Sequence, residues 1–282
     1  MEISIPNKKY FEKIKKLMSY QKKEKIQVIT DFDRTLTKAF YKDEKAPSII
    51  AYLRNRKYLV EDYPKKAHDL FNKYHPIEID PDYPLDRKRE KMQEWWEKHF
   101  KLLIDMGLDK KTIKESVKNM VKEKALEFRE GVEDFLKFLK DNDIPLIIMS
   151  SSVGDMIKEF LNEKGVYYDN IHVISNTLEF DKTGDVVGVK KIIHVFNKHE
   201  MELTILPNYK KLLDRTNVIL LGDSLGDIGM VEGFPYKNLI KIGFLNYNLK
   251  EAKDDFEKAY DVVIMGEGDF SFVNELLRNI LE

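Results

Sequence analysis

Apolar residues fall into short runs that are separated by longer amphipathic segments. Six of these runs have the length and the β-branched content of strands buried on both faces: residues 25–30, 144–149, 171–174, 218–221, 239–244 and 262–265. Runs of this kind are typical of a parallel sheet that helices cover on both sides.

Apolar residues at three- and four-residue spacing predict the helices. This spacing occurs at 8–20 and 130–140, and again at 156–161, where Gly165 is well placed to end the helix. Residues 178–189 instead suggest a hairpin. Because strands alternate with helices along most of the chain, we expect a doubly wound, Rossmann-like α/β fold with a mainly parallel sheet.

One long segment interrupts this alternation. Residues 38–128 are charged, aromatic and mostly helical in pattern, and we expect breaks at five prolines: Pro47, Pro64, Pro76, Pro81 and Pro84. Apolar stripes predict the packing of a small helical bundle by Leu102, Leu103, Met106, Ile113, Val117, Met120 and Val121. We therefore expect a core formed by residues 1–37 and 129–282, with residues 38–128 inserted as a helical domain.

Composition excludes several classes of function. The 282 residues are 43% hydrophobic, so we expect a chain that buries a full core and folds alone as a monomer. The net charge of -1 argues against a nucleic acid polymer or an anionic membrane as partner. The absence of cysteine excludes disulfides, thiolate zinc sites and cysteine nucleophiles. Without a signal-peptide pattern or a bilayer-spanning stretch, we expect a soluble cytoplasmic protein.

The first predicted strand breaks off into two aspartates, Asp31 and Asp33. Residues i and i+2 of an extended chain point the same way, so both carboxylates can face one small ligand beyond the end of the strand. The carboxylates repel each other, and a cation or a shared proton must lie between them. The D-x-D-x-T pattern alone carries little weight, because about one chain in twenty of this length contains it by chance and Asp and Thr are common in turns.

Two further predicted strands end in polar loops. The second strand runs into Ser150, and the fourth runs into a loop that contains Asp223 and Asp227; Lys198 lies between them in the sequence. Because parallel strands end at one edge of a sheet, these residues and the first two aspartates can share a site. Taken singly, Ser150 and the two aspartates are explained as well by helix capping, and Lys198 by a solvated lysine. The repetition in this order favours a shared site.

Together these residues resemble the haloacid dehalogenase-like phosphatases. The four motifs of that superfamily match D-x-D-x-T at 31–35, Ser150, Lys198 and G-D-x-x-x-D at 222–227, in the same order. A narrower resemblance, to the pyrimidine 5'-nucleotidases of the cytosolic type III group, rests on residues 29–33, 74–81, 94–95, 193–199 and 220–224. The run His-Val-Phe-Asn-Lys-His at 194–199 is the most specific of these matches.

The resemblance implies hydrolysis in two steps. Asp31 would attack phosphorus and form an aspartyl-phosphate, while Asp33 would act as general acid on the leaving nucleoside oxygen and then as general base on water. Mg²⁺ would be bound by Asp31, by the main-chain carbonyl of Asp33 and by the carboxylate of Asp223. Asp227 would hold this shell from behind.

The phosphate group would be bound by Ser150, by the backbone amide of Ser151 near a helix N-terminus, and by the charge of Lys198. The family commonly has Ser-Ala-Gly where this chain has Ser150, Ser151 and Ser152, a difference that changes the backbone freedom of the loop.

The resemblance also implies that residues 38–128 are a cap that closes over the site and contacts the base. Glu78 matches the base-recognising glutamate, whose carboxylate can accept from an amino group or pair with a positively charged base. From the residues alone, Glu78 would be a surface glutamate in a loop. His99 stands where some members place a serine near the base, which leaves pyrimidine and 7-methylguanosine both open. Aromatic residues around it can stack on a base or pack the cap: Trp95, Trp96 and Phe100.

We therefore expect a Mg²⁺-dependent 5'-nucleotidase that hydrolyses nucleoside monophosphates through Asp31. CMP and UMP are the first candidate substrates, 7-methyl-GMP is a further one, and phosphotransfer to a second nucleoside is a side activity. One alternative is a phosphatase of the same fold that acts on phosphoserine or a sugar phosphate. Another is a nucleotide-binding protein without turnover, against which the full set of mutually repelling acids argues.

Overall fold

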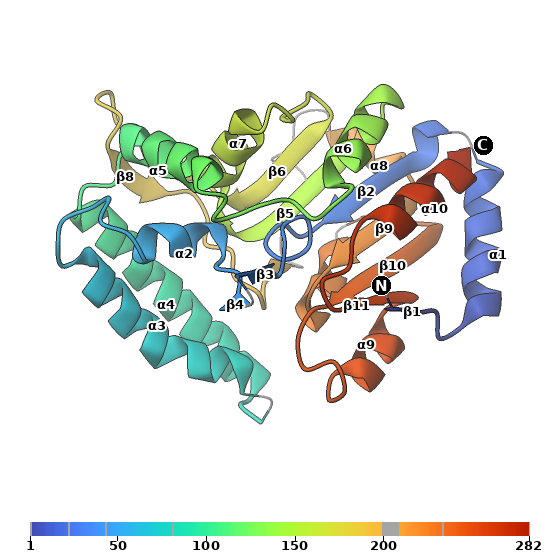
Figure 1. The fold of residues 1–282 in the computed structure, drawn as a ribbon, viewed down its shortest axis with the longest axis horizontal. Helices are drawn as coiled ribbons and strands as arrows, with labels where there is room; N and C mark the ends of the chain where they lie inside the picture. Colours follow the sequence, from blue (N-terminus) through green and yellow to red (C-terminus); the bar gives the residue numbers. More distant parts are fainter. Residues whose placement is uncertain are drawn as a thin grey trace.

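The computed structural model describes residues 2–21, 23–42, 44–80, 82–198, 209–232 and 234–281. Its central feature is a seven-stranded sheet of order β1-β11-β10-β9-β2-β5-β6 (Figure 1). These strands are β1 (Glu2–Ser4), β2 (Ile26–Thr30), β5 (Leu146–Val153), β6 (Ile171–Asn176), β9 (Asn217–Gly222), β10 (Asn238–Leu245) and β11 (Val262–Met265). Among them β1 runs antiparallel to β11, and the other neighbours are parallel. The predicted doubly wound, mainly parallel fold is confirmed.

Successive residues of the central strands pack on opposite faces of the sheet. In β2, Val28 belongs to one hydrophobic cluster and Ile29 to another, and Ile148 and Ile147 of β5 divide in the same way. Side chains alternate between the faces of an extended strand, so a strand covered on both sides has to be apolar at every position. This is the physical reason for the continuous apolar runs in the sequence.

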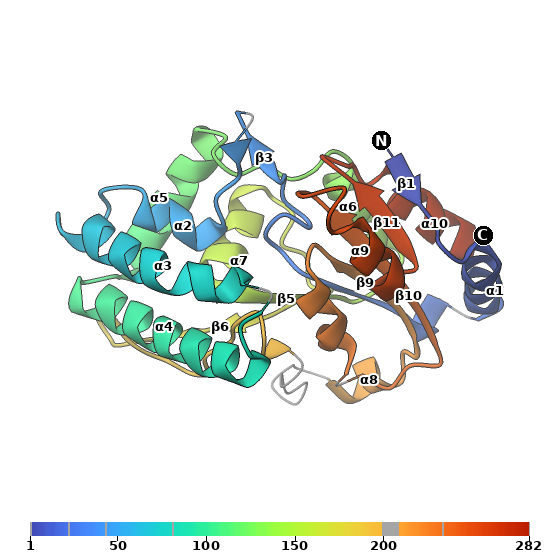
Figure 2. The same cartoon turned by 90° about the horizontal axis from the view of Figure 1, so that it is seen from below.

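Helices cover both faces of this sheet (Figure 2). On one face, the apolar sides of four helices pack into the larger hydrophobic cluster: α1 (Lys8–Ser19), α6 (Val132–Asp141), α7 (Gly154–Glu163) and α10 (Ser271–Leu281). The other face is covered by α8 (Tyr209–Leu213), the 3-10 helix η4 (Leu225–Val231) and α9 (Lys253–Ala259). A short 3-10 helix, η1 (Lys23–Lys25), leads into β2. In the described part of the chain, no helix has the length and apolar character needed to cross a membrane.

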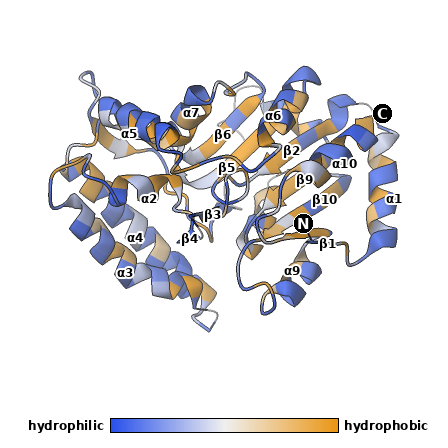
Figure 3. Ribbon diagram, in the orientation of Figure 1, coloured by the Kyte–Doolittle hydropathy of each residue, from blue (hydrophilic) through white to orange (hydrophobic). Residues whose placement is uncertain are grey.

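A helical segment, residues 38–128, separates β2 from α6. It contains β3 (Phe40–Tyr41), β4 (Glu44–Lys45), α2 (Ile49–Arg54), α3 (Tyr63–Ile79), α4 (Leu85–Asp105) and α5 (Lys110–Lys122). Both views show α3 and α4 side by side (Figures 1 and 2). The predicted bundle residues of α4 and α5 are buried in the main cluster or packed against it. The ribbon coloured by hydropathy shows the result, with mostly apolar strands inside and mixed helices around them (Figure 3).

The helix break that we predicted at Pro76 is wrong, because Pro76 lies inside α3. A proline within a helix lacks one amide donor and costs about 3 kcal/mol. The packing of α3 along α4 offsets this cost: Tyr74 is fully buried, in a cluster with Met92 and Trp95 of α4. Pro81, at another predicted break, lies outside the described residues.

A hairpin follows β6, as predicted from residues 178–189. Its strands are β7 (Leu178–Phe180) and β8 (Val186–Val189), which pair antiparallel. Gly184, in the predicted turn, has a φ of 98°, which a residue with a side chain rarely adopts. Gly165 has a φ of 69° just after α7 and ends that helix, also as predicted.

Candidate active site

The register of the three central strands brings their polar ends to one edge of the sheet. Thr30 of β2 is paired with Ile148 of β5 on one side and with Leu221 of β9 on the other. The ladder continues for one more step, because the amide of Asp31 donates to the carbonyl of Leu221 (3.0 Å). Asp31, Ser150 and the loop after β9 therefore lie at the same edge of the sheet.

A buried lysine joins two of the predicted aspartates. Nζ of Lys198 lies 2.5 Å from Oδ1 of Asp31 and 2.7 Å from Oδ1 of Asp227. All three residues are less than 10% exposed, so water screens their charges only weakly. Lys198 therefore holds the Asp31 carboxylate in one orientation, and Asp227 holds Lys198.

Asp227 also organises the loop after β9. Its Oδ2 accepts from the amides of Asp223 (3.0 Å) and Ser224 (2.9 Å). Ser224 and Asp227 form a capping box at the start of η4, so the capping role considered for this loop is present. Since the other oxygen of the same carboxylate contacts Lys198, capping and site construction are performed by one side chain.

Asp33 is fixed by the helical segment. Its Oδ1 accepts from the amide of Ile49, the first residue of α2, at 2.8 Å. Burial and, to a smaller extent, the neighbouring charge of Asp31 together raise the pKa of Asp33 to about 7, against the opposing effect of Arg34. A carboxyl group with this pKa can hold a proton near neutral pH and also release it.

Asp31 and Asp223 are perturbed in the same direction. Burial raises the pKa of Asp31 to about 7, although Lys198 opposes the change, and burial raises the pKa of Asp223 to about 6. Crowded carboxylates with raised pKa values indicate a place where positive charge is favourable. Among the described residues, no group of three acidic or imidazole side chains converges as metal ligands.

We did not foresee the role of Arg34 in this loop. Its φ of 62° is in the left-handed region, which turns the chain sharply after Asp33. Its Nε lies 3.8 Å from Oδ2 of Asp223. Burial acts to lower the pKa of the guanidinium, but the charges of Asp223 and Asp33 outweigh burial and raise this pKa. A backbone conformation of this kind has no signature in the apolar pattern.

The structure corrects the expected end of the second strand. We predicted that it stops at Met149, but β5 continues to Val153 with an irregular register between these residues, and α7 begins only at Gly154. The cause is local: Oγ of Ser150 accepts from the amide of Ser152 (3.1 Å), which bulges the chain inside the strand. The three serines therefore lie in a bulge before the helix.

Asn176 is a second residue that we did not predict. Its fully buried side chain donates to the carbonyls of Ser151 (2.7 Å) and Ile193 (2.9 Å) and accepts from the amide of Ile193 (2.7 Å). Asn176 thus ties the serine bulge to the segment that leads to Lys198. Its place at the end of a buried strand is the signal that would have identified it. His199, the last residue of the predicted motif at 194–199, lies outside the described residues.

The two predicted base-contacting residues lie in the helical segment. Glu78 is in the last turn of α3, not in a loop, and its Oε2 lies 2.8 Å from Nδ1 of His75. His99 of α4 is 5% exposed, and its Nε2 is within hydrogen-bonding distance (3.2 Å) of the hydroxyl of Tyr63. Burial lowers the pKa of His99 to about 4. The structure therefore places His99 inside the packing of the segment and leaves Glu78 partly exposed.

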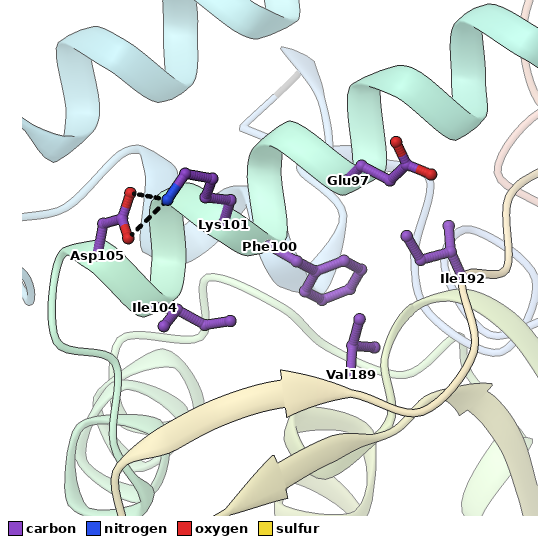
Figure 4. Close-up of a pocket in the computed structure, with 7 residues that line it drawn as sticks. All are labelled: Glu97, Phe100, Lys101, Ile104, Asp105, Val189 and Ile192. Carbon is purple, nitrogen blue, oxygen red and sulfur yellow. Dashed lines mark hydrogen bonds and ion pairs between the residues drawn. The ribbon is translucent and has the colours of Figure 1, made fainter.

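A pocket of about 310 Å³ lies elsewhere, between α4 and the chain around β8 (Figure 4). Phe100, Ile104, Val189 and Ile192 form its apolar wall, while Lys101 pairs with Asp105 at its rim. None of its lining residues belongs to the ends of β2, β5 or β9 or to the loop after β9, so this pocket is separate from the candidate site.

Comparison with known proteins agrees with this geometry. Residues 34–281 match the model of the pyrimidine 5'-nucleotidase (UMPH-1) family. The chain is 37% identical over 260 residues to the 7-methylguanosine phosphate-specific 5'-nucleotidase of Mus musculus. The aligned region covers 92% of this chain and 85% of that protein.

Solved structures are also similar. The crystal structure of cytosolic 5'-nucleotidase IIIB bound to cytidine superimposes with a TM-score of 0.88 at 27% identity, over 99% of this chain and 93% of that one. A haloacid dehalogenase-family hydrolase from Salmonella enterica shares the fold with a TM-score of 0.55 at 15% identity, over 92% of this chain and 72% of that one. The chain thus has the haloacid dehalogenase-like fold and belongs to the pyrimidine 5'-nucleotidase family.

Proposed function

We propose that this protein is a Mg²⁺-dependent 5'-nucleotidase that hydrolyses pyrimidine nucleoside monophosphates and 7-methyl-GMP to nucleoside and phosphate. The observation that carries the proposal is the buried carboxylate of Asp31, oriented by Lys198 and flanked by Asp33 and Asp223. The names of the similar proteins, one specific for 7-methylguanosine phosphate and one bound to cytidine, support both kinds of base.

In the first step, an oxygen of Asp31 attacks phosphorus and the bond from phosphorus to the nucleoside oxygen breaks. Asp33 gives its proton to that leaving oxygen. The raised pKa of Asp33 supports this role, because a carboxyl group with a pKa of about 7 keeps its proton in a substantial share of the molecules near neutral pH. The hydrogen bond from the amide of Ile49 keeps Asp33 in place.

In the second step, water attacks the phosphorus of the aspartyl-phosphate. Asp33, now ionised, takes a proton from this water, and the bond between phosphorus and Asp31 breaks. The products are inorganic phosphate and free Asp31. One residue thus serves as acid and then as base, so the site returns to its starting protonation state.

Lys198 places positive charge next to the attacked phosphate, and Asp227 fixes the ammonium group. Ser150 and the amide of Ser151 are proposed to bind phosphate oxygens from the bulge in β5. Asn176 supports this group by holding Ser151 and the lysine segment together.

The donor set fits Mg²⁺. The carboxylates of Asp31 and Asp223 and the carbonyl of Asp33 are hard oxygen donors, and a shell completed by water is usual for this ion. The raised pKa values of both carboxyl groups support this, because nearby positive charge offsets the cost of ionising a buried carboxyl group. When bound, Mg²⁺ would supply positive charge that lets the anionic Asp31 approach an anionic phosphate.

Residues 38–128 are proposed to act as the cap that selects the base. The adjoining ends of α3 and α4 contact the segment that leads to Lys198. Phe196 of that segment packs against the cluster of Tyr74 and Trp95, and Arg89 donates to the carbonyl of Phe196 (3.3 Å). This contact joins the half of α3 that carries Glu78 to the segment that leads to Lys198, and it supports the proposal that the cap contacts the substrate. A carboxylate there can accept from the amino group of cytosine and can pair with the positive ring of 7-methylguanine.

A substrate panel tests the proposal. We expect phosphate release with Mg²⁺ from CMP, UMP and 7-methyl-GMP to exceed that from phosphoserine and glucose 6-phosphate. In Glu78→Gln, kcat/KM for 7-methyl-GMP should fall about tenfold or more, the effect of a lost bond to a charged group, and fall less for CMP because Gln still accepts from an amino group.

Glu90→Gln is the matched control, since Glu90 is also a helical glutamate paired with a basic residue three positions away, Arg87. Equal turnover of all esters by the parent protein would contradict the nucleotidase assignment. An equal loss on every ester in Glu78→Gln, or the same loss in Glu90→Gln, would contradict base reading by Glu78.

We also propose a cytosolic location. The similar structure is named a cytosolic 5'-nucleotidase, and a relative from Caenorhabditis elegans, 31% identical over 263 residues, is named a putative cytosolic 5'-nucleotidase 3.

A further inference from the structure

Arg129 lies where the helical segment returns to the core. Its side chain is fully buried, and its guanidinium stacks over the ring of Phe244 at 4.5 Å from the centroid. Its backbone amide donates to the carbonyl of Leu36 (3.0 Å). A buried arginine needs a partner for each donor, because unpaired polar groups away from water are costly.

Two partners of this guanidinium belong to the loop that follows Asp31 and Asp33, and two more lie just after β11. Nε donates to the carbonyl of Thr35 (3.0 Å), and Nη2 donates to the carbonyl of Arg34 (2.5 Å). Nη1 donates to the carbonyl of Gly268 (2.7 Å) and lies 3.5 Å from Oε1 of Glu267. Arg34 has a left-handed backbone, so Arg129 holds the left-handed bend of the loop that follows Asp31 and Asp33, the nucleophile loop.

Asn246 extends this contact to the other acidic loop. Nη2 of Arg129 also donates to Oδ1 of Asn246 (2.6 Å). The amide group of Asn246 donates to the carbonyl of Arg34 (3.1 Å) and lies 3.4 Å from Oδ2 of Asp223. Both residues are less than 5% exposed, and together they bridge the loops of Asp33 and Asp223.

We propose that Arg129 is a positioning residue for the phosphatase reaction: its guanidinium, through the Arg34 carbonyl and Asn246, fixes the spacing between the nucleophile loop and Asp223. The inference rests on the proposed function, because it assigns Arg129 to the alignment of that site. The planar fork is necessary, since it donates to four carbonyl oxygens along two edges while its face lies on Phe244.

The test compares two conservative substitutions. Arg129→Lys keeps a positive charge but has three donors on a flexible stem, so it cannot fill the fork. Arg215→Lys is the matched control, because Arg215 also donates to three backbone carbonyls, those of Lys23, Ile26 and Asp143. Ile26 begins β2, so this cluster is at the end of the strand opposite Asp31.

Two readouts separate alignment from folding. We expect kcat for CMP, per folded molecule, to fall about 10²-fold in Arg129→Lys with KM changed less than about threefold, the size of effect that a small misplacement of reacting groups produces. Titration calorimetry with Mg²⁺ on the metal-free proteins should show weaker binding in Arg129→Lys. Arg215→Lys should lower Tm and leave both quantities unchanged.

Asn246→Ala provides a second variant that leaves Arg129 in place. It should reproduce the loss of kcat and the weaker Mg²⁺ binding, because it removes the link to Asp223. The inference is overturned if Arg129→Lys or Asn246→Ala keeps the parent kcat and Mg²⁺ affinity, or if Arg215→Lys loses them equally. Failure of the parent protein to hydrolyse any nucleotide would instead count against the proposed function.

Discussion

At the scale of single residues, the site is a group of charges that are buried together. Lys198 lies between Asp31 and Asp227, and Asp33 and Asp223 lie beside them with raised pKa values. A stable protein rarely buries so many charged groups unless they perform chemistry. The two aspartates have different partners, which supports different roles for them. Asp31 contacts the ammonium group of Lys198, whereas the described hydrogen bond of the Asp33 carboxyl group is to a backbone amide.

Asp33→Asn tests the proton-transfer role. Asparagine can still accept from the amide of Ile49 but carries no acidic proton, so kcat for CMP should fall roughly 10² to 10⁴-fold. With p-nitrophenyl phosphate, whose leaving group needs no proton, we expect a rapid burst of about one p-nitrophenol per enzyme followed by slow turnover. Stopped-flow absorbance measures the burst. Equal loss on both esters without a burst would refute the assignment of Asp33.

The raised pKa values also predict how stability depends on pH. Folded Asp31 and Asp33 have pKa values of about 7, above the ordinary 3.8, so the folded protein holds these protons more tightly than the unfolded chain. Stability therefore falls as pH rises through the interval from about 4 to about 7. Buried His99 acts in the opposite direction up to its ordinary pKa of 6.5, so the clearest window is above that value.

Differential scanning fluorimetry measures this effect between pH 6.5 and 8. Metal-free protein should lose Tm over this range, and the rise in Tm caused by Mg²⁺ should grow with pH because the ionised carboxylates bind the cation. Asp33→Asn removes one titrating group and should show a smaller loss. A metal-free Tm that rises with pH, with no response to Mg²⁺, would be the opposite result.

At the scale of elements, the ends of strands decide where the functional groups lie. Gly222, the last residue of β9, packs so closely that a Cβ there would lie 2.5 Å from Cβ of Asp227 and 2.9 Å from the hydroxyl of Tyr260. Asp227 in turn caps η4 and holds Lys198. The junction of β9 and η4 thus links local packing to the charges of the site.

Gly222→Ala should therefore affect both stability and activity. The methyl group must push Asp227 away, and we expect a loss of about 1–3 kcal/mol in the free energy of unfolding and at least about a tenfold lower kcat. Chemical denaturation and phosphate release measure these two quantities. Gly188→Ala is the control, because its Cβ would come too close only to Oε2 of Glu179 (2.7 Å), the far end of a flexible side chain. Parent-like activity in Gly222→Ala would show that Asp227 does not need this position.

Much at this scale could be predicted from the sequence. The continuous apolar runs identified β2, β5, β6, β9, β10 and β11, because burial on both faces leaves that pattern. We did not identify β1, α9 or α10, and the bulge in β5 was missed because it depends on hydrogen bonds between neighbouring serines. Pro76 was misjudged because the packing of Tyr74 against α4, which a local pattern does not contain, outweighs helix propensity.

In the candidate site, too, some residues could be predicted from the sequence and others could not. The aspartates, Ser150 and Lys198 were found because they follow apolar runs or match known motifs, whereas Arg129 and Asn246 carry no local signal and are defined by contacts between distant segments. The structure places every one of the predicted aspartates at one edge of the sheet. His99 lies inside the packing of the helical segment, where its ring contacts Tyr63 and Trp96.

At the scale of the whole molecule, the helical segment is joined closely to the core. Its two ends run side by side, with Thr37 bridged to Phe128 and the amide of Lys38 donating to the carbonyl of Glu127 (2.9 Å). The main hydrophobic cluster includes residues of both parts. Asp33 is hydrogen-bonded to the first residue of α2, so any movement of the helical segment would shift the carboxyl group of Asp33, the proposed proton donor.

The central claim is that Asp31 is the nucleophile of a 5'-nucleotidase, and the most direct measurement is phosphate release from CMP and 7-methyl-GMP by parent and Asp31→Asn protein with Mg²⁺. We predict turnover by the parent and at least about a thousandfold lower kcat in the variant, because loss of a nucleophile removes the covalent route. Circular dichroism confirms that the variant is folded. Parent-like release of phosphate by folded Asp31→Asn would contradict the mechanism.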